Sequence, residues 1–451
     1  MAIDLRNKRI SIIGAGRSGT AVAEVVRSSG GIPFVSDSGE CNREKVSRLE
    51  KMGIDFECGR HSSKVYKCDF MVVSPGVPSN ADIIIKARSI GLTVWPEVEL
   101  AYRICKGKVI GITGSNGKTT TTTLIGEILR RGGKEVAVCG NIGSPFIASA
   151  ADISPDGFAV VELSSFQLEL IEDFEAHVAV FLNITPDHLD RHGDFKSYFA
   201  AKTRIFENQE ADDFAVVNYD DSILREKGDI IKSRISWFST SEQVPNGIWG
   251  DTDGDLIVGG KAVIKSNELK IKGTHNLSNA CAATGAALNV GVKINDIAEA
   301  LKSFPGVEHR LEPVRLIGGV SFINDSKGTN VDSVRWALLA VSAPVILIAG
   351  GKDKGGDFSA LNELIAEKVK AVILIGLAAR KILKEWESIT KCVSAGDMND
   401  AVRIAFDLTI EGDTVLLSPG CASFDMFENF EHRGRVFKTA VVKLASREVA
   451  G

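Results

Sequence analysis

A glycine-rich loop ahead of a predicted helix carries the sharpest chemical signal in the sequence. Residues 110–119 read Ile-Gly-Ile-Thr-Gly-Ser-Asn-Gly-Lys-Thr, so a short apolar strand runs into glycines and then into Lys118 and Thr119. Backbone N–H groups in such a loop cradle phosphate oxygens, a lysine neutralises the outer phosphates, and a hydroxyl binds Mg²⁺. We therefore predict a triphosphate site, although Ile112 stands where the strict pattern has glycine. A glycine-rich turn with a surface lysine is the alternative.

Two other strand ends offer groups that bind metal ions. Glu162 closes the apolar run Val160-Val161, and a carboxylate there suits a divalent cation. His188 follows the strand end at Asn183-Ile-Thr-Pro-Asp and is a second candidate ligand. The residues alone leave open a helix-capping role for Glu162 and a structural role for His188.

A second nucleotide signal lies near the start of the chain. Gly14-Ala-Gly16-Arg-Ser-Gly19 follows a predicted strand, and Asp37 ends the next strand. This is the layout of a dinucleotide-binding turn with an acid for a ribose, so a nicotinamide-dependent dehydrogenase is one hypothesis. A tight turn needed only for helix packing is another. A dehydrogenase has no need for a triphosphate loop, so both signals together indicate that ATP activates a substrate that itself carries a nucleotide.

Strands and helices that alternate along the chain must position these groups. Apolar, β-branched runs predict strands, and a meander with turn pairs spans 247–273. The repeated strand–helix order indicates an α/β fold with mostly parallel sheets, in three segments with boundaries near 96 and 306. Ligands of such sheets bind beyond the carboxyl ends of the strands. The predicted strands are 9–13, 32–35, 70–73, 109–113, 158–161, 178–182, 215–217, 345–349, 372–375 and 414–417.

Composition limits the class of protein. The 451 residues are 44% hydrophobic and 25% charged, as in globular proteins, and 53 Lys and Arg against 58 Asp and Glu leave a net charge of −5. No basic stripe predicts nucleic-acid binding, and no apolar run approaches a membrane span. None of the eight cysteines forms a Cys-x-x-Cys pair. We expect free thiols and a cytoplasmic protein that binds neither membrane nor nucleic acid.

Seven motifs resemble those of the Mur ligases. The resemblance covers essentially the whole chain in order, from Gly14 to about Arg435, which makes it stronger than any single loop. Two of the motifs, Ser-Ser-Phe-Gln-Leu-Glu and Ser-Pro-Gly-Cys-Ala-Ser, resemble the members that add D-glutamate. The motifs are Gly114-Ser-Asn-Gly-Lys-Thr119, Glu162-Leu-Ser-Ser-Phe-Gln-Leu-Glu169, Asn183-Ile-Thr-Pro-Asp-His-Leu-Asp190, His275-Asn-Leu-Ser-Asn279, Glu308-His-Arg-Leu-Glu312, Asn324-Asp-Ser-Lys-Gly-Thr-Asn330 and Ser418-Pro-Gly-Cys-Ala-Ser-Phe-Asp425.

The resemblance implies three α/β domains with sheets flanked by helices. These are a Rossmann-like domain over 1–96 for a uridine-diphosphate sugar, a P-loop ATPase-like domain over 97–306, and a Rossmann-like domain over 307–451 for the amino acid. The sugar-nucleotide residues would be Ser18, Asp37, Ser38, Ser74, Gly76 and Asn141. The ATP residues would be Gly114, Ser115, Asn116, Gly117, Lys118, Thr119, Thr120, Asn279, Arg310 and Asp325. The D-glutamate residues would be Thr329, Lys354, Ser423 and Phe430, with Lys352 as a rival of Lys354.

The same resemblance implies a reaction. ATP would phosphorylate the carboxylate of UDP-N-acetylmuramoyl-L-alanine, and D-glutamate would attack the acyl phosphate, in peptidoglycan precursor synthesis. Lys118, Glu162, His188 and Lys202 would be catalytic. Two Mg²⁺ ions would be held by Thr119, Glu162, His188 and Lys202, the last as a CO₂-derived carbamate. We also expect a monomer.

Three alternatives to this reaction stay open from the sequence. A sister Mur ligase or a folate polyglutamate ligase would use a different amino acid. The second is the dehydrogenase, and the third is a non-catalytic sugar-nucleotide sensor built on the same fold. Lys118, Glu162 and His188 disfavour the sensor, because a protein that only binds a sugar nucleotide has no need of groups that act on a triphosphate.

Overall fold

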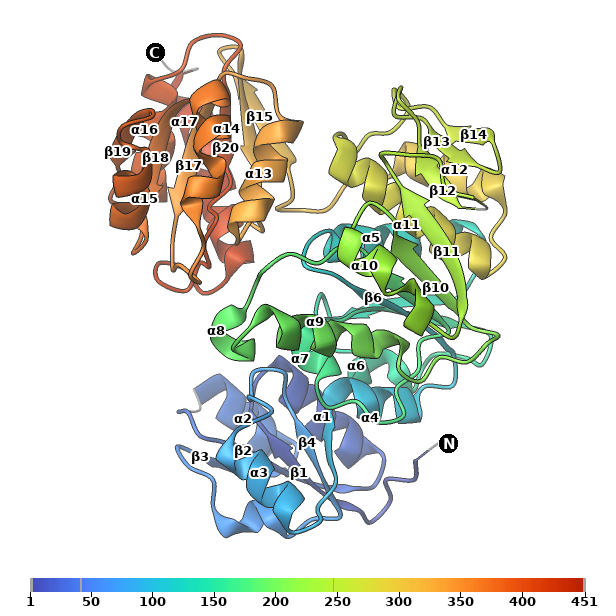
Figure 1. The fold of residues 1–451 in the computed structure, drawn as a ribbon. Helices are drawn as coiled ribbons and strands as arrows, with labels where there is room; N and C mark the ends of the chain where they lie inside the picture. The colour runs from blue at the N-terminus through green and yellow to red at the C-terminus, as the bar shows by residue number, and fades with distance from the viewer. Residues whose placement is uncertain (1–2, 41–42, 246, 449–451) are drawn as a thin grey trace. The chain divides into compact units, whose positions relative to one another are not determined.

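The structure is a computed structural model that describes residues 3–40, 43–245 and 247–448. It has three sheets within these residues, of five, nine and six strands, and all three are mostly parallel and flanked by helices (Figure 1). The predicted α/β fold class is therefore confirmed. No helix of the described residues combines the length and the apolar character needed to cross a membrane.

The first sheet has the strand order β3-β2-β1-β4-β5 and is entirely parallel. Because side chains alternate across a strand, Ile10 and Ile12 pack on one face with α1, and Ile13 packs on the other face with α3. The elements are β1 (Arg9–Ile13), α1 (Arg17–Ser28), β2 (Ile32–Asp37), α2 (Arg43–Lys51), β3 (Asp55–Cys58), the 3₁₀ turn η1 (Ser63–Tyr66), β4 (Phe70–Val73), α3 (Asp82–Ser89), β5 (Val94–Pro96) and α4 (Glu97–Ile104).

The second sheet has the order β14-β13-β12-β11-β10-β9-β6-β8-β7, parallel from β7 to β12 and antiparallel beyond. The predicted meander thus extends a parallel sheet. Its elements are β6 (Lys108–Thr113), α5 (Lys118–Arg131), β7 (Val136–Gly140), α6 (Ile147–Ala150), β8 (Phe158–Glu162), α7 (Ser165–Leu168), β9 (Val178–Phe181), α8 (Leu189–His192), α9 (Phe195–Thr203), η2 (Arg204–Phe206), β10 (Phe214–Asn218), α10 (Ser222–Glu226), η3 (Gly228–Ile230), β11 (Arg234–Ser239), β12 (Ile248–Gly250), β13 (Leu256–Val258), β14 (Lys261–Ile264), α11 (Thr274–Asn289) and α12 (Ile294–Ser303).

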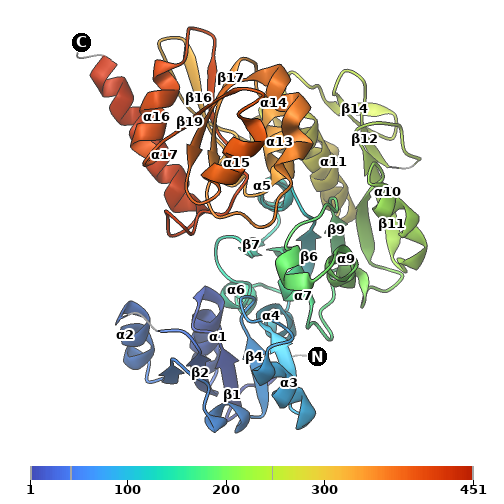
Figure 2. The same cartoon turned by 60° about the vertical axis from the view of Figure 1, so that its left-hand side comes forward.

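The third sheet has the order β15-β16-β20-β17-β18-β19, with β15 antiparallel to its neighbour. Leu347 of β17 packs against α13 to α15, whereas Ile346 and Ile348 pack against α16 and α17 on the opposite face (Figure 2). The elements are β15 (Glu312–Ile317), β16 (Val320–Asn324), α13 (Val331–Ala340), β17 (Val345–Gly350), η4 (Phe358–Leu361), α14 (Asn362–Lys368), β18 (Val369–Ile375), α15 (Ala379–Trp386), β19 (Lys391–Ser394), α16 (Met398–Asp407), β20 (Thr414–Leu417) and α17 (Phe430–Glu448).

The chain forms two compact units. Unit 1 comprises 1–184, 191–270 and 276–304, and it holds the first two sheets. Unit 2 comprises 185–190, 271–275 and 305–451, and it holds the third sheet. The domain boundaries predicted at 96 and 306 stay a prediction.

The cysteines differ in one respect from the expectation of free thiols. Among the described residues six cysteines are free, namely Cys68, Cys105, Cys139, Cys281, Cys392 and Cys421, whereas Cys41 lies outside the described residues. Cys58, at the end of β3, is bonded in a disulfide, so the expectation is wrong for this residue. Sequence spacing did not reveal it, because disulfide partners need only meet in space.

Candidate functional site

The glycine-rich loop joins the end of β6 at Thr113 to the start of α5 at Lys118. Gly117 has φ 84°, a left-handed conformation that glycine adopts without strain. A Cβ atom at this position would also come within 2.3 Å of Asn279 Oδ1. The loop therefore requires glycine here for both its backbone conformation and its space.

The end of β9 holds the loop in shape. Asn183 Oδ1 accepts a hydrogen bond from Asn116 N at 2.8 Å, and the Asn183 carbonyl accepts one from Ser115 N at 3.0 Å. Lys118 Nζ folds back along the loop and donates to the carbonyls of Gly114 at 2.7 Å and Ser115 at 2.9 Å. The cation thus lies over the turn that the helix N-terminus faces, which is the arrangement that suits a bound phosphate.

Glu162 lies beside this loop at the end of β8, with only 1% of its surface exposed. Its Oε2 accepts a hydrogen bond from Thr119 Oγ1 at 2.8 Å, and its Oε1 accepts one from Asn141 Nδ2 at 2.8 Å. Both donors are neutral, and a buried carboxylate is costly without a cation. The carboxylate and the adjacent hydroxyl are hard oxygen ligands, so the pair fits a divalent cation.

Lys202, near the end of α9, also contacts the loop. Its side chain is buried, and its Nζ donates to the Gly114 carbonyl at 2.8 Å and to Thr113 Oγ1 at 3.4 Å. Lys202 and Glu162 are therefore both close to the phosphate loop. Asn279, on α11, also reaches it, because its Oδ1 accepts a hydrogen bond from Thr121 Oγ1 at 3.2 Å. Thr120 is buried on α5.

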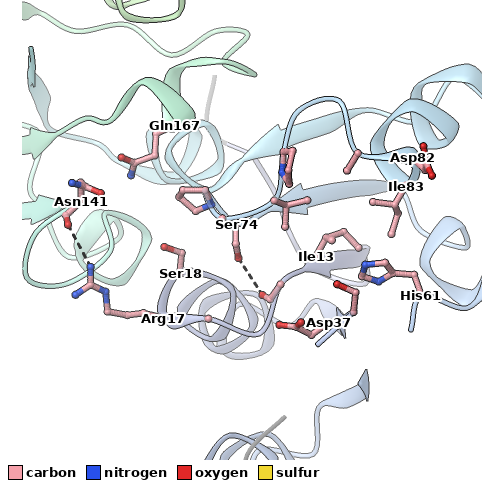
Figure 3. Close-up of a pocket in the computed structure, with 18 of the residues that line it drawn as sticks. Ile13, Arg17, Ser18, Asp37, His61, Ser74, Asp82, Ile83, Asn141 and Gln167 are labelled. Atoms are coloured by element: carbon pink, nitrogen blue, oxygen red, sulfur yellow. Dashed lines mark hydrogen bonds between the residues drawn. The ribbon is translucent and has the colours of Figure 1, made fainter. Parts of the chain in front are cut away.

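A cavity of about 690 Å³ opens beyond the carboxyl ends of the first sheet and reaches the second (Figure 3). Its walls come from the glycine turn after β1, the ends of β2 and β4, and the segments that carry Asn141 and Gln167. Arg17 spans the two parts, because its Nη2 donates to the Asn141 carbonyl at 3.4 Å. All six residues predicted for the sugar nucleotide line this cavity: Ser18, Asp37, Ser38, Ser74, Gly76 and Asn141.

The carboxylate of Asp37 organises the turn on the cavity wall. Its Oδ2 accepts a hydrogen bond from Ala15 N at 2.7 Å, and its Oδ1 accepts one from Gly39 N at 2.8 Å. Ser74 Oγ donates to the Gly14 carbonyl at 3.1 Å. The loops after β1, β2 and β4 are thus tied together into one wall.

Asp325 follows β16 in unit 2 and is buried. Burial raises the pKa of its carboxyl to about 7, although a hydrogen bond from Ser418 and the charge of Arg310 act in the opposite direction. Ser418 Oγ donates to Asp325 Oδ2 at 2.8 Å, and Leu311 N donates to Oδ1 at 3.3 Å. Asp325 therefore joins the loops after β16 and β20 to the segment that carries Arg310.

The residues predicted for D-glutamate lie on neighbouring loops of unit 2. Lys352 and Ala422 exchange backbone hydrogen bonds of 2.8 and 3.0 Å, which brings the loop of Lys354 beside that of buried Ser423. Lys354 Nζ is 4.0 Å from Asp187 Oδ1 within the same unit, whereas the Lys352 side chain is exposed. Thr329 lies on the loop after β16, and Phe430 begins α17 with Lys327 Nζ 3.8 Å from its ring centroid.

His188 lies in the segment 185–190 of unit 2, so the structure does not group it with the phosphate loop of unit 1. It has φ 55°, and its backbone N–H donates to Asp187 Oδ1 at 2.9 Å. Its role as a metal ligand stays a prediction.

Sequence reasoning missed two residues that the fold makes prominent. Arg433 on α17 is completely buried, with Nε donating to Ser326 Oγ at 3.0 Å, Nη2 to the Ser326 carbonyl at 2.7 Å and Nη1 to the Cys421 carbonyl at 3.0 Å. Burial lowers the pKa of its guanidinium to about 10. His61 lines the cavity of unit 1. No local pattern marks either residue, because each gains its partners only from distant parts of the chain.

Comparison with known proteins gives consistent relatives along the whole chain. The profile of the MurD N-terminal domain matches residues 9–83, that of the Mur ligase middle domain matches 112–287, and that of the Mur ligase glutamate ligase domain matches 309–421. The UDP-N-acetylmuramoylalanine–D-glutamate ligase of Koribacter versatilis is 44% identical over 452 residues, which cover 99% of this chain and 100% of that protein. The ligase of the same name from Acidobacterium capsulatum is 44% identical, over 98% of this chain and 97% of that protein.

Solved structures share the fold at lower sequence identity. The UDP-N-acetylmuramate–alanine ligase of Thermotoga maritima superimposes with a TM-score of 0.64 and 20% identity, covering 97% of this chain and 99% of that one. This likeness concerns the architecture alone. No comparison favours a dehydrogenase.

Proposed function

Because this chain belongs to the family of UDP-N-acetylmuramoylalanine–D-glutamate ligases, we propose that it joins D-glutamate to UDP-N-acetylmuramoyl-L-alanine at the expense of ATP. It is a ligase of peptidoglycan precursor synthesis. The proposal includes action in the cytoplasm as a monomer.

One observation carries the assignment of the acceptor site. The six predicted sugar-nucleotide residues share one cavity, and Asn141 on its wall donates a hydrogen bond to Glu162 beside the phosphate loop. An acceptor whose nucleotide lies deep in this cavity can therefore extend its carboxylate towards Lys118 and Glu162. Unit 1 alone can thus bring the two anionic reactants together.

The phosphate loop would reduce the electrostatic repulsion between the two reactants of the first step. A carboxylate and a triphosphate repel each other, and the repulsion is strong where water is excluded. Lys118 and the amides of Gly114 to Thr119 would bind the phosphates, and Thr119 with Glu162 would hold Mg²⁺. When bound, that ion would supply positive charge, so the residues of the protein would mainly position the reactants.

The reaction would then proceed in two steps. A carboxylate oxygen of the acceptor forms a bond to the γ-phosphorus while the bond between that phosphorus and ADP breaks. The D-glutamate amine next forms a bond to the acyl carbon, the bond from that carbon to the phosphate oxygen breaks, phosphate leaves with the electron pair, and the amine proton passes to solvent. Arg310, Asp325 and Asn279 would surround the adenosine. Thr329, Lys354, Ser423 and Phe430 would surround D-glutamate, with Lys354 rather than exposed Lys352 facing its carboxylates.

Lys202 and His188 belong to a finer part of the proposal. A carbamate on Lys202, formed from CO₂, would turn the buried cation beside Gly114 into an anionic oxygen ligand. With His188 it would hold a second Mg²⁺ on the acceptor carboxylate. The position of Lys202 Nζ against the loop supports this role for Lys202.

A phosphate-release assay with an amino-acid panel tests the proposal. The chain is supplied with ATP, Mg²⁺ and UDP-N-acetylmuramoyl-L-alanine, and each D- or L-amino acid is added in turn. We expect phosphate release with D-glutamate only, and loss of about a hundredfold or more in kcat for Lys118→Ala, since one charge-stabilising donor is worth that much. The matched control is Lys196→Ala, an exposed lysine on α9. Turnover with L-alanine or a diamino acid instead would assign the chain to a sister activity.

A further inference from the structure

A chain of three polar side chains runs from β3 to the cavity wall of unit 1. Ser36 Oγ, on buried β2, lies 2.7 Å from Glu57 Oε1 and 2.7 Å from His61 Nδ1. Glu57 Oε1 also accepts the backbone N–H of Ser62 at 2.8 Å. His61 lines the cavity, whereas Ser36 and Glu57 stand behind it.

The ionised state of Glu57 decides which atoms of this hydrogen-bonded chain donate and which accept. Partial burial raises the pKa of its carboxyl, but hydrogen bonds from Ser62 and Ser36 outweigh burial and lower that pKa below its usual value. An ionised carboxylate only accepts, so the Ser36 hydroxyl donates to Glu57. Ser36 Oγ then has only lone pairs left for His61, and Nδ1 must be the nitrogen that carries the proton. The neutral ring therefore has an unprotonated Nε2, which is an acceptor.

His61 stands at the end of the cavity that lies away from the chemistry. Figure 3 shows Asn141, Gln167 and Arg17 at one end and His61, Asp82 and Ile83 at the other. Asn141 contacts Glu162 next to the phosphate loop, so the reacting end of the acceptor belongs there. The base of the nucleotide then belongs at the end with His61.

We propose that His61 Nε2 accepts a hydrogen bond from the imide N3–H of uracil and so selects uracil over cytosine. This inference rests on the proposed sugar-nucleotide acceptor. Uracil carries a proton on N3, whereas cytosine has a lone pair there. Cytosine would place its N3 lone pair against His61 Nε2, so two acceptors would face each other without a proton between them. Such unpaired polar groups in a binding site disfavour the wrong ligand and give the site its specificity.

Binding of UDP and of CDP to the full chain, measured by calorimetry, tests the assignment. We expect the wild-type chain to bind UDP at least about tenfold more tightly than CDP, the worth of one hydrogen bond. His61→Phe keeps the ring but removes the acceptor, so UDP and CDP should bind equally. The control His177→Phe replaces a histidine that contacts Asp213 and does not line the cavity, and it should retain the preference.

The variant Ser36→Ala tests whether the preference for UDP depends on the tautomer of His61 or only on the presence of its ring. Without the hydroxyl, the His61 ring can move its proton to Nε2 and donate to cytosine N3. CDP binding should therefore improve while UDP binding weakens, although the ring itself is unchanged. Ser11→Ala, a buried serine on the adjacent strand β1, is the matched control and should change neither.

The outcomes distinguish this inference from the proposed function. UDP binding by the wild-type chain with the same UDP-to-CDP ratio in His61→Phe overturns the assignment of His61 alone. Failure of the wild-type chain to bind UDP overturns the acceptor site as well. If His61→Phe does not fold, N3-methyl-UDP serves instead: it should bind the wild-type chain about tenfold more weakly than UDP, and equal binding overturns the inference.

Discussion

At the scale of single residues, the phosphate loop is bordered by two buried groups of opposite charge. Glu162 accepts hydrogen bonds from neutral donors only, and Lys202 donates to a backbone carbonyl and a hydroxyl. The neutral donors compensate the burial of the Glu162 charge only in part. A metal ion that completes the site during turnover would supply the missing positive charge.

Lys202→Ala tests the carbamate directly. The variant should lose about a hundredfold in kcat, and short carboxylic acids such as acetate or formate should restore part of it, because they can occupy the place of the carbamate oxygens. The measurement is phosphate release with the acid titrated. The control Lys196→Ala, on the exposed face of the same helix, should show neither loss nor rescue. A loss that no acid restores would indicate an ordinary structural lysine.

At the scale of elements, α17 is tied to two loops of the third sheet through Arg433. One guanidinium holds the Ser326 segment after β16 and the Cys421 segment after β20, and these segments flank Asp325 and Ser423. Arg433→Met should therefore lower the melting temperature and raise the KM for D-glutamate more than that for the acceptor. Three buried partners would lose their donors, at a cost of about 3 kcal/mol or more in the free energy of unfolding.

Arg435→Met is the matched control for this prediction, because Arg435 is exposed on the same helix. It should leave both the melting temperature and the KM values unchanged. If Arg433→Met folds and keeps its KM for D-glutamate, the loops are positioned by other contacts.

Helix α4 begins with Glu97, a buried carboxyl that should make the free energy of unfolding depend on pH. Glu97 is buried; its Oε1 accepts the Ile147 N–H at 2.7 Å, and burial raises its pKa from 4.5 to about 7 despite that hydrogen bond. The folded protein thus keeps a proton that the unfolded chain releases near 4.5. The free energy of unfolding should fall as pH rises from 4.5 through about 7, since ionisation of the buried group opposes folding.

Glu97→Gln should remove this dependence, because the amide resembles the protonated acid and does not ionise. Urea unfolding of the full chain, followed across this pH range, should show the free energy of unfolding of the variant rising relative to that of the wild-type chain as pH rises. Parallel pH profiles for the two proteins would contradict the assignment.

At the scale of the whole molecule, the groups of the proposed reaction are divided between the two units. The phosphate loop, Glu162 and Lys202 belong to unit 1, and the candidate D-glutamate residues belong to unit 2. The chain crosses between the units several times, and the last crossing, between Phe304 and Pro305, leads into the main part of unit 2. We expect ATP and acceptor together to change the arrangement of the two units about a hinge near residues 303–306. Small-angle scattering should then give a different profile with both ligands present, and a profile that both ligands leave unchanged would count against this hinge.

The sequence predicted the strands that are apolar throughout and that end at glycine-rich or polar loops. Val345–Gly350, Thr414–Leu417 and the strand before the phosphate loop were found because buried parallel strands are continuous β-branched runs. The short strands Asp55–Cys58 and Lys391–Ser394 were missed, because edge strands carry polar residues and their pairing partners decide them.

The candidate site was predictable to a similar degree. The loop and its glycines carry local signals, and the resemblance to the Mur ligases supplied residues such as Asn141 and Asp325. Arg433 and the Glu57–Ser36–His61 chain carry no such signal. Their roles depend on hydrogen bonds between segments separated by many residues, which a sequence pattern does not reveal.

Transfer of an oxygen atom tests the central claim most directly, because an acyl phosphate must pass one carboxylate oxygen to the released phosphate. UDP-N-acetylmuramoyl-L-alanine labelled with oxygen-18 in its carboxylate is turned over with ATP and D-glutamate, and the inorganic phosphate is analysed by mass spectrometry. The proposed reaction predicts one labelled oxygen in each phosphate, with the other retained in the amide product. Unlabelled phosphate, or label in AMP, would contradict it.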